Sequence, residues 1–235
     1  MQRYFIKNKI NNIVELEQSD LHHIKKVMRM LIGDRIECVF ENKLYLCEIK
    51  SLDPVNIEIV EELEIEESNK PNITICIPLL VEQKMDFILQ KCTELGVNEI
   101  YLFDASRSKI KFDEEKLNKK IERWTRICKE ASEQSHRIDI PKISGVYKIK
   151  DLLKYNGLKL VCSTSTCQSI KKVLKKAYNY DRIIIVVGPE GGISDKEENE
   201  FLSVGFERIS LGPNILRAET APICALSIIN YEFME

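Results

Sequence analysis

A glycine-rich corner offers the first chemistry in this sequence. The apolar run at 183–187 ends in the loop GPEGG at 188–192, and a helix is predicted to follow it. The loop lacks the spacing of a P-loop or a dinucleotide fold. Ser194 and Glu197 have the spacing of a capping box, and Asp195 adds negative charge there. The corner therefore favours a flat, neutral or cationic ligand near glycine backbone over a polyphosphate, with a ligand-free tight turn as the alternative.

A second corner carries two charged side chains in an apolar neighbourhood, after the end of another predicted strand. These are Arg217 and Glu219. Burying such charges is costly unless they pair or act, so they form either a structural ion pair or part of a reactive site. Thr220 is predicted to cap the next helix, with Pro222 in its first turn.

Strands that alternate with helices from residue 72 onward predict how these corners are positioned. The alternation indicates an α/β fold with a mostly parallel sheet covered on both faces. A third corner, VCSTSTC at 161–167, ends another strand in hydroxyl residues. Because ligands of such sheets bind at the carboxyl ends of the strands, the three corners are expected to wall one pocket.

The first 68 residues predict a smaller unit of another kind. Alternating apolar and polar residues indicate strands, and the stretch 33–50 reads as a hairpin that turns near Glu41 and Asn42. One helix interrupts the strands, and its predicted cap is Ser19 or Asp20. Its predicted apolar stripe consists of Leu21, Ile24, Val27, Met28 and Leu31. Strands with one helix suggest a small β-barrel, joined by a polar linker at 63–72 to the rest of the chain.

Composition and charge limit the classes of function and the cellular location that we expect for the chain. The chain has 235 residues, of which 44% are hydrophobic and 31% are charged, and its net charge is −2. Residues 104–182, however, hold 20 Lys and Arg against 10 Asp and Glu. This excess fits either an RNA-facing surface or a solvated lysine-rich helix face. We expect a cytoplasmic protein, because the sequence has no apolar run of membrane-spanning length and no signal peptide. The eight cysteines are expected to be buried thiols rather than zinc ligands.

Motifs along the whole chain resemble one known family. VVGPEGGIS at 186–194, LGPNILRAETAPICAL at 211–226, HHIKKVMRMLIGD at 22–34 and QKCTELGV at 90–97 are similar to the RsmE family of the SPOUT methyltransferase superfamily. The resemblance implies S-adenosylmethionine-dependent methylation of N3 of a uridine in small-subunit (16S) ribosomal RNA. It also implies a PUA-like, RNA-binding β-barrel at 1–68, a SPOUT domain with a trefoil knot at 72–235, a homodimer and no metal.

The resemblance also implies site residues. The family's cofactor loops correspond to Leu160, Val161, Cys162, Ser163, Gly188, Pro189, Glu190, Gly191, Gly192, Leu211, Gly212, Ile215, Leu216, Arg217, Thr220 and Ala221. For catalysis, our hypothesis is that Arg217 stabilises the uridine anion, while Glu219 orients Arg217 or accepts the N3 proton. A second hypothesis concerns basic residues that bind RNA phosphates, which are Arg3, Lys25, Lys26, Arg29, Arg107, Arg123, Arg126 and Arg137.

Two departures from the family leave questions open. A Lys-Gly pair common in the family is replaced here by Val81 and Glu82, although Lys84 matches, and a stretch that often reads SERS is ASRS at 105–108. The resemblance implies that the substrate is either naked 16S ribosomal RNA or the small ribosomal subunit. The alternatives are a ribose 2′-O or other RNA methyltransferase of the same superfamily, and a non-catalytic RNA-binding factor for ribosome assembly.

Overall fold

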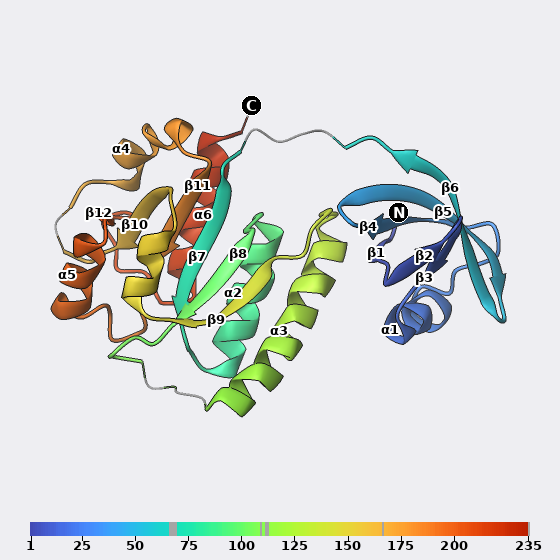
Figure 1. Ribbon diagram of the computed structural model, residues 1–235, viewed down its shortest axis with the longest axis horizontal. Helices are drawn as coiled ribbons and strands as arrows, with labels where there is room; N and C mark the ends of the chain where they lie inside the picture. The colour runs from blue at the N-terminus through green and yellow to red at the C-terminus, as the bar shows by residue number, and fades with distance from the viewer. Residues whose placement is uncertain (66–69, 109, 111–112, 166, 235) are drawn as a thin grey trace. The chain divides into compact units, whose positions relative to one another are not determined.

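The computed structural model describes residues 1–65, 70–108, 110, 113–165 and 167–234 (Figure 1). The chain divides into two compact units, one of Met1–Ser68 with Ser132–Asp139 and one of Asn69–Ala131 with Ile140–Glu235. Residues 132–139, expected in the larger domain, thus belong to the smaller unit. The predicted linker at 63–72 and the corner at 161–167 include residues 66–69 and 166, which lie outside the described residues.

The smaller unit is built on a mostly antiparallel sheet. Its strands are β1 (Arg3–Phe5), β2 (Asn8–Ile10), β3 (Ile13–Glu15), β4 (Arg35–Phe40), β5 (Lys43–Leu52) and β6 (Val55–Leu63), in the order β1-β4-β5-β6-β3-β2. Only the β1–β4 pair among these is parallel. The predicted hairpin is confirmed, because Glu41 and Asn42 connect β4 to β5 with φ of 50° and 62°, as a type I′ turn requires.

The helix of the smaller unit differs from its prediction. Helix α1 (Gln18–His22) begins after Glu17, and it continues as a π-helix, η1 (His23–Val27). A π-helix bonds residue i to i+5, which shifts its side chains off the spacing of an α-helical stripe. Ile24 is fully buried, but the last three members of the predicted stripe, Val27, Met28 and Leu31, are exposed. The predicted cap and the C-terminal half of the stripe were therefore wrong.

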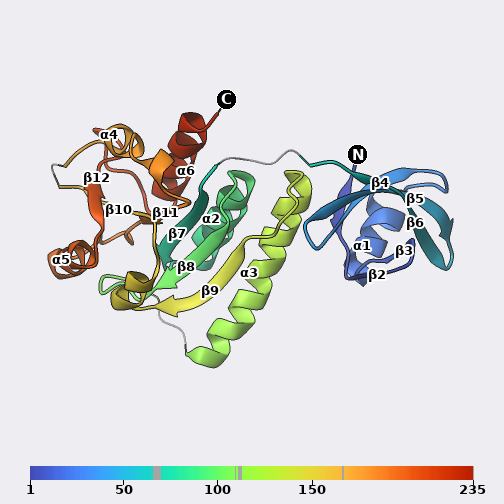
Figure 2. The ribbon, with the colours of Figure 1, turned by 45° about the horizontal axis from the view of Figure 1, so that its top comes forward.

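The larger unit alternates strands and helices (Figures 1 and 2). Its elements, with α3 running on into the smaller unit, are β7 (Asn72–Pro78), α2 (Glu82–Glu94), β8 (Glu99–Phe103), α3 (Glu114–Gln134), β9 (Lys142–Tyr147), η2 (Ile149–Lys154), β10 (Leu158–Cys162), α4 (Ile170–Leu174), η3 (Ala177–Asn179), β11 (Arg182–Val186), α5 (Asp195–Ser203), β12 (Glu207–Ile209) and α6 (Thr220–Glu232). The strands form one sheet, in the order β12-β10-β11-β7-β8-β9, in which every neighbouring pair is parallel. This confirms the predicted parallel α/β sheet.

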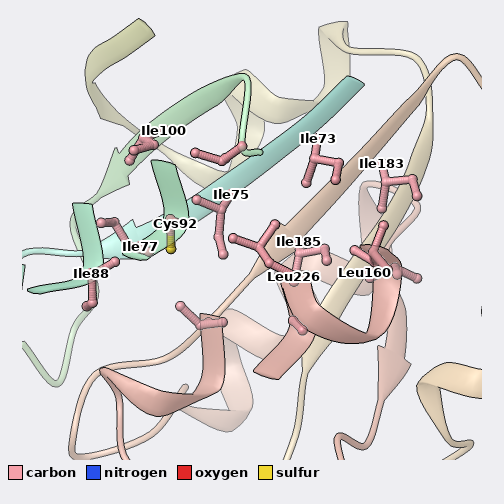
Figure 3. Close-up of a cluster of buried hydrophobic side chains, with 14 of the residues drawn as sticks. Ile73, Ile75, Ile77, Ile88, Cys92, Ile100, Leu160, Ile183, Ile185 and Leu226 are labelled. Carbon is pink, nitrogen blue, oxygen red and sulfur yellow. The ribbon is translucent and has the colours of Figure 1, made fainter. Parts of the chain in front are cut away.

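Both faces of this sheet are covered, because its strand residues alternate between two hydrophobic clusters. Ile183 and Ile185 of β11 pack into a cluster with side chains of α2, α3, α4 and α6, and Figure 3 shows them on the side of Leu226 from α6. Ile184 and Val186 of the same strand pack instead with side chains of η2 and α5. The register places β10 between β12 and β11, so the loops after these three strands emerge side by side.

Candidate functional site

The loops after β10, β11 and β12 enclose a cavity of about 680 Å³. Most predicted cofactor residues line it, namely Cys162, Ser163, Gly188, Pro189, Glu190, Gly191, Gly192, Leu211, Gly212, Ile215, Leu216, Arg217 and Ala221. It is also lined by Lys84 of α2 and by Arg107 of the loop after β8. The three corners expected to wall one pocket therefore do so.

Three residues predicted for the cofactor loops have other positions. Leu160 and Val161 are fully buried in β10, where their side chains pack into the two core clusters. Thr220 is not among the residues that line the cavity. It also does not cap α6, because it is the first helical residue and Glu219 occupies the N-cap position.

The start of α5 forms the predicted capping box. The Ser194 amide donates to Glu197 Oε2 at 2.9 Å, and the Glu197 amide donates to Ser194 Oγ at 3.3 Å. Ser106, which sequence reasoning missed, adds bonds from its amide to Oε1 at 2.6 Å and from its hydroxyl to Oε2 at 2.8 Å. Burial alone would raise the pKa of Glu197, but the hydrogen bonds from Ser194 and Ser106 outweigh it and lower this pKa.

Arg107 packs on the glycine loop itself. Its Nη1 donates to the carbonyl of Gly191 at 3.0 Å. A Cβ on Gly191 would lie 3.0 Å from Cβ of Arg107, and a Cβ on Gly188 would lie 3.0 Å from the Ile193 side chain. A side chain at either position would therefore force its neighbour to shift, so close packing around the loop favours glycine there. In the stretch ASRS, the arginine therefore supports the cavity wall.

An ion triad of Lys84, Glu190 and Glu219 joins three elements at the cavity. Lys84 Nζ lies 2.9 Å from Glu190 Oε1 and 3.2 Å from Glu219 Oε2, so it joins the first turn of α2 to the glycine loop and to the start of α6. Lys84 and Glu190 line the cavity, whereas Glu219, whose side chain is 16% exposed, is not among its lining residues. Both glutamates raise the pKa of Lys84.

Glu219 forms its salt bridge with a different residue from Arg217, the ion partner considered from the sequence. Its salt bridge is to Lys84, while Arg217 is exposed at the cavity wall. Burial would raise the pKa of Glu219, but its own backbone N–H, Lys84 and the nearby charge of Arg217 lower it, so the carboxylate is ionised at neutral pH. Sequence reasoning gave Lys84 no role, because no local pattern connects it with Glu190 or Glu219.

The basic residues proposed for RNA divide into two groups. Four of them have partners within the fold, namely Arg3, Arg107, Arg123 and Arg137, although Arg107 is itself exposed. Arg3 is 8% exposed and forms a salt bridge with Glu37, and Arg137 pairs with Asp139. Arg123 pairs with Asp86 and with Glu82, the residue that departs from the family pattern.

The second group is open to solvent. Lys26, Arg29 and Arg126 are exposed, and Lys25 is half-buried. Arg29 ends the helical segment in the left-handed region, with φ of 51°. These four residues remain available for phosphate contacts, whereas the burial of Arg3 and Arg137 argues against that role for them.

A second cavity of about 640 Å³ lies at the amino ends of the strands in the larger unit. Tyr101 stacks on Tyr147 with ring centroids 4.6 Å apart, and Lys154 Nζ lies 5.4 Å from the centroid of Tyr147. Glu99 accepts from Tyr101 at 2.8 Å and pairs with Arg182 at 3.0 Å. Because these side chains contact one another through hydrogen bonds, an ion pair and ring contacts, we interpret the cluster as a structural part of the fold.

In the described part of the chain, no group of three or more His, Cys, Asp or Glu has the arrangement of a metal site. No helix there has the length and apolar character needed to cross a membrane. All eight cysteines fall within the described residues, five of them are buried, and none forms a disulfide.

Comparison with known proteins gives full-length matches. A model of an RNA methyltransferase domain matches residues 66–230, and a model of an RNA methyltransferase PUA domain matches residues 16–62. "Ribosomal RNA small subunit methyltransferase E" of Bacillus subtilis is 36% identical, over 99% of this chain and 97% of its own. The protein of the same name from Mesomycoplasma hyopneumoniae is 34% identical, over 97% of this chain and 98% of its own.

A solved structure agrees with these matches. The ribosomal RNA small subunit methyltransferase E of Neisseria gonorrhoeae, bound to S-adenosyl methionine, superposes with a TM-score of 0.89 at 26% identity. The superposition covers 99% of this chain and 98% of the other. The PUA-like domain and the methyltransferase domain expected from the sequence are thereby confirmed, while the knot stays a prediction.

Proposed function

We propose a function from one premise, that this chain belongs to the ribosomal RNA small subunit methyltransferase E family. The protein methylates N3 of a uridine in 16S ribosomal RNA, with S-adenosylmethionine as the methyl donor. The observation that carries this proposal is the cavity at the strand ends, whose glycine loop and ion triad lie in a chain that matches the family along nearly its whole length.

The residues of the cavity fit this methyl donor. Glycine loops leave backbone groups open to a flat adenosine, and the volume of about 680 Å³ is in the usual range for small-molecule sites. The capping box and Asp195 disfavour a polyphosphate, while Glu190 is compatible with a cationic sulfur. When bound, S-adenosylmethionine supplies a methyl group on positively charged sulfur. The backbone around Ser163, the loop 188–192 and Leu211 to Leu216 would hold it.

Two charged residues have separate roles in the proposed reaction. Arg217, exposed on the cavity wall, stabilises the negative charge that uracil gains when N3 loses its proton. Glu219 was expected either to orient Arg217 or to accept that proton. Because its salt bridge is to Lys84, we propose instead that Glu219 positions Lys84. The gain from holding the base and the methyl donor in line is of order 7–11 kcal/mol in well-oriented systems.

The remaining parts of the proposal concern the partners. The smaller unit is the RNA-binding domain, and the substrate is 16S ribosomal RNA or the small ribosomal subunit, which places the enzyme in the cytoplasm. The protein acts as a homodimer, and α6 is the candidate interface, because Ile223 and Ile228 remain partly exposed on an otherwise apolar helix. Light scattering of the full chain should give twice the subunit mass of 27.3 kDa, and a monomer would refute the dimer.

One experiment separates this function from its alternatives. Ribosomal RNA from cells that lack the gene is mapped for N3-methyluridine, with and without rescue by the wild-type gene. Loss and rescue of one N3-methyluridine support the proposal, whereas loss of a 2′-O-methyl group indicates a ribose methyltransferase. Calorimetry with S-adenosylmethionine adds a second test, because a protein that binds RNA but no methyl donor would be an assembly factor.

A further inference from the structure

We propose that Lys84 is a positioning residue of the methyl-transfer site, which holds the glycine loop 188–192 and the start of α6 at the spacing the cavity needs. The inference rests on the proposed function for its catalytic meaning, but its geometric content is independent of activity. The evidence for it consists of the two short contacts of one ammonium group with two carboxylates, one on the glycine loop and one directly before α6.

The contacts of Lys84 bring two negatively charged carboxylates close together. Since Lys84 Nζ lies 2.9 Å from one carboxylate and 3.2 Å from the other, the Glu190 and Glu219 oxygens are within about 6 Å of each other. Two carboxylates at that separation repel each other unless a cation stands between them or one takes up a proton. The lysine therefore permits both acids to stay ionised beside each other.

The two carboxylates belong to two segments that help to form the cavity. Glu190 belongs to the loop that packs so closely on Arg107 that a Cβ at Gly191 would lie 3.0 Å from the Arg107 Cβ. Glu219 directly precedes α6 and lies two residues after Arg217. A displacement of either carboxylate moves a cavity wall, so the effect of Lys84 on the reaction is exerted through the glycine loop and through the segment that carries Arg217.

Hydrogen exchange on the ligand-free, full-length protein tests the inference without any need for activity. In Lys84→Met, we expect the amides of 188–192 and of the first turn of α6 to exchange about tenfold faster, because no cation then offsets the repulsion between the two carboxylates and local opening becomes easier. Lys84→Arg should restore the wild-type pattern, since it keeps the charge. Removing one of the two repelling acids in the double variant Lys84→Met/Glu190→Gln should slow exchange again, relative to Lys84→Met alone.

A matched control comes from the same helix. Lys91 also forms a salt bridge on α2, with Glu94 at 2.8 Å, and it does not line the cavity. Lys91→Met should leave exchange of the glycine loop unchanged. Unchanged exchange in Lys84→Met, or an equal increase in Lys84→Met, Lys84→Arg and the double variant, would overturn the inference.

Binding and activity then separate this inference from the proposed function. The KM for S-adenosylmethionine should rise in Lys84→Met by more than kcat falls, and Lys84→Arg should recover most of the difference. If the wild type methylates RNA and Lys84→Met exchanges and reacts like it, the positioning role fails and the function stands. If exchange changes as expected but the wild type binds no methyl donor, the function fails and the geometric role of Lys84 stands.

Discussion

At the scale of single residues, Glu197 shows how a buried charge can support a cavity wall. Its carboxylate is 8% exposed and accepts hydrogen bonds from Ser106 and Ser194. In Glu197→Gln, we expect a loss of roughly 1.5–3 kcal/mol in the free energy of unfolding at pH 7, the usual range for hydrogen bonds to a charged group. Denaturant unfolding measures this loss, and Glu200→Gln on the same helix α5 serves as the control.

The pH dependence of that loss follows from the lowered pKa of Glu197. A carboxyl whose pKa is depressed by folding contributes stability above its unfolded pKa of about 4.3, and this contribution disappears as the pH falls through the lower folded value. The stability difference between wild type and Glu197→Gln should therefore be largest near neutral pH and shrink in strong acid. A difference of equal size at pH 7 and pH 3 would contradict this account.

Arg217 is the residue whose removal should separate binding from chemistry. Arg217 is exposed on the cavity wall, and in the proposed reaction it stabilises charge only as the uridine anion develops. On that proposal, Arg217→Ala should lower kcat by about 10²–10³, as loss of an oxyanion donor does. Affinity for S-adenosylmethionine, measured by calorimetry, should change little. An equal loss of affinity and rate would assign Arg217 to cofactor binding instead.

Some interactions of the site could be predicted from the sequence and others could not. Ser194 and Glu197 were predictable because a capping box is set by three-residue spacing along one chain segment. The partnership of Lys84 with Glu190 and Glu219 was not, because it depends on which loops the sheet order brings together. For the same reason, the hydrogen bond from Ser106 to Glu197 could not be predicted. The salt bridges that keep Arg3 and Arg137 from being solvent-exposed could not be predicted either.

At the scale of elements, the close packing of the glycine loop gives a direct test. Gly191→Ala places a Cβ 3.0 Å from the Arg107 Cβ, so the loop or the arginine must shift. We expect overpacking to cost about 1–3 kcal/mol and to weaken binding of S-adenosylmethionine. Gly145→Ala in β9 is the matched control, because a Cβ there meets nothing within 4 Å. Similar affinities in both variants would show that the loop tolerates the added methyl group.

The elements that escaped prediction have physical reasons in common. The strand β9 is largely exposed or half-buried, so its sequence KISGVY lacks the apolar signal by which β7 and β11 were found. In the smaller unit, a π-helix replaced the expected α-helical turn and broke the predicted apolar stripe. Strongly periodic, buried segments were thus predictable, while edge strands and irregular helices depend on packing that the sequence pattern does not report.

At the scale of the whole molecule, we expect the distribution of charge to matter more for RNA binding than the net charge. The chain carries −2 overall, yet Lys26 in the π-helix of the smaller unit and Arg29 just after it are both exposed. If Lys26 and Arg29 contact phosphates, each contact releases counterions on binding, and affinity falls with salt in proportion to their number. The double variant Lys26→Ala/Arg29→Ala should therefore weaken RNA binding and flatten the slope of log K against log salt by about two units.

The control for that measurement lies in the same unit. Lys43 and Lys50 are also exposed, but each forms a salt bridge with a glutamate, Glu62 and Glu48 respectively. Lys43→Ala/Lys50→Ala removes the same number of charges, and we expect it to leave the salt slope unchanged, because these cations are neutralised locally. Equal slopes in the two double variants would mean that RNA responds to the total charge of the unit, and would remove Lys26 and Arg29 as specific phosphate contacts.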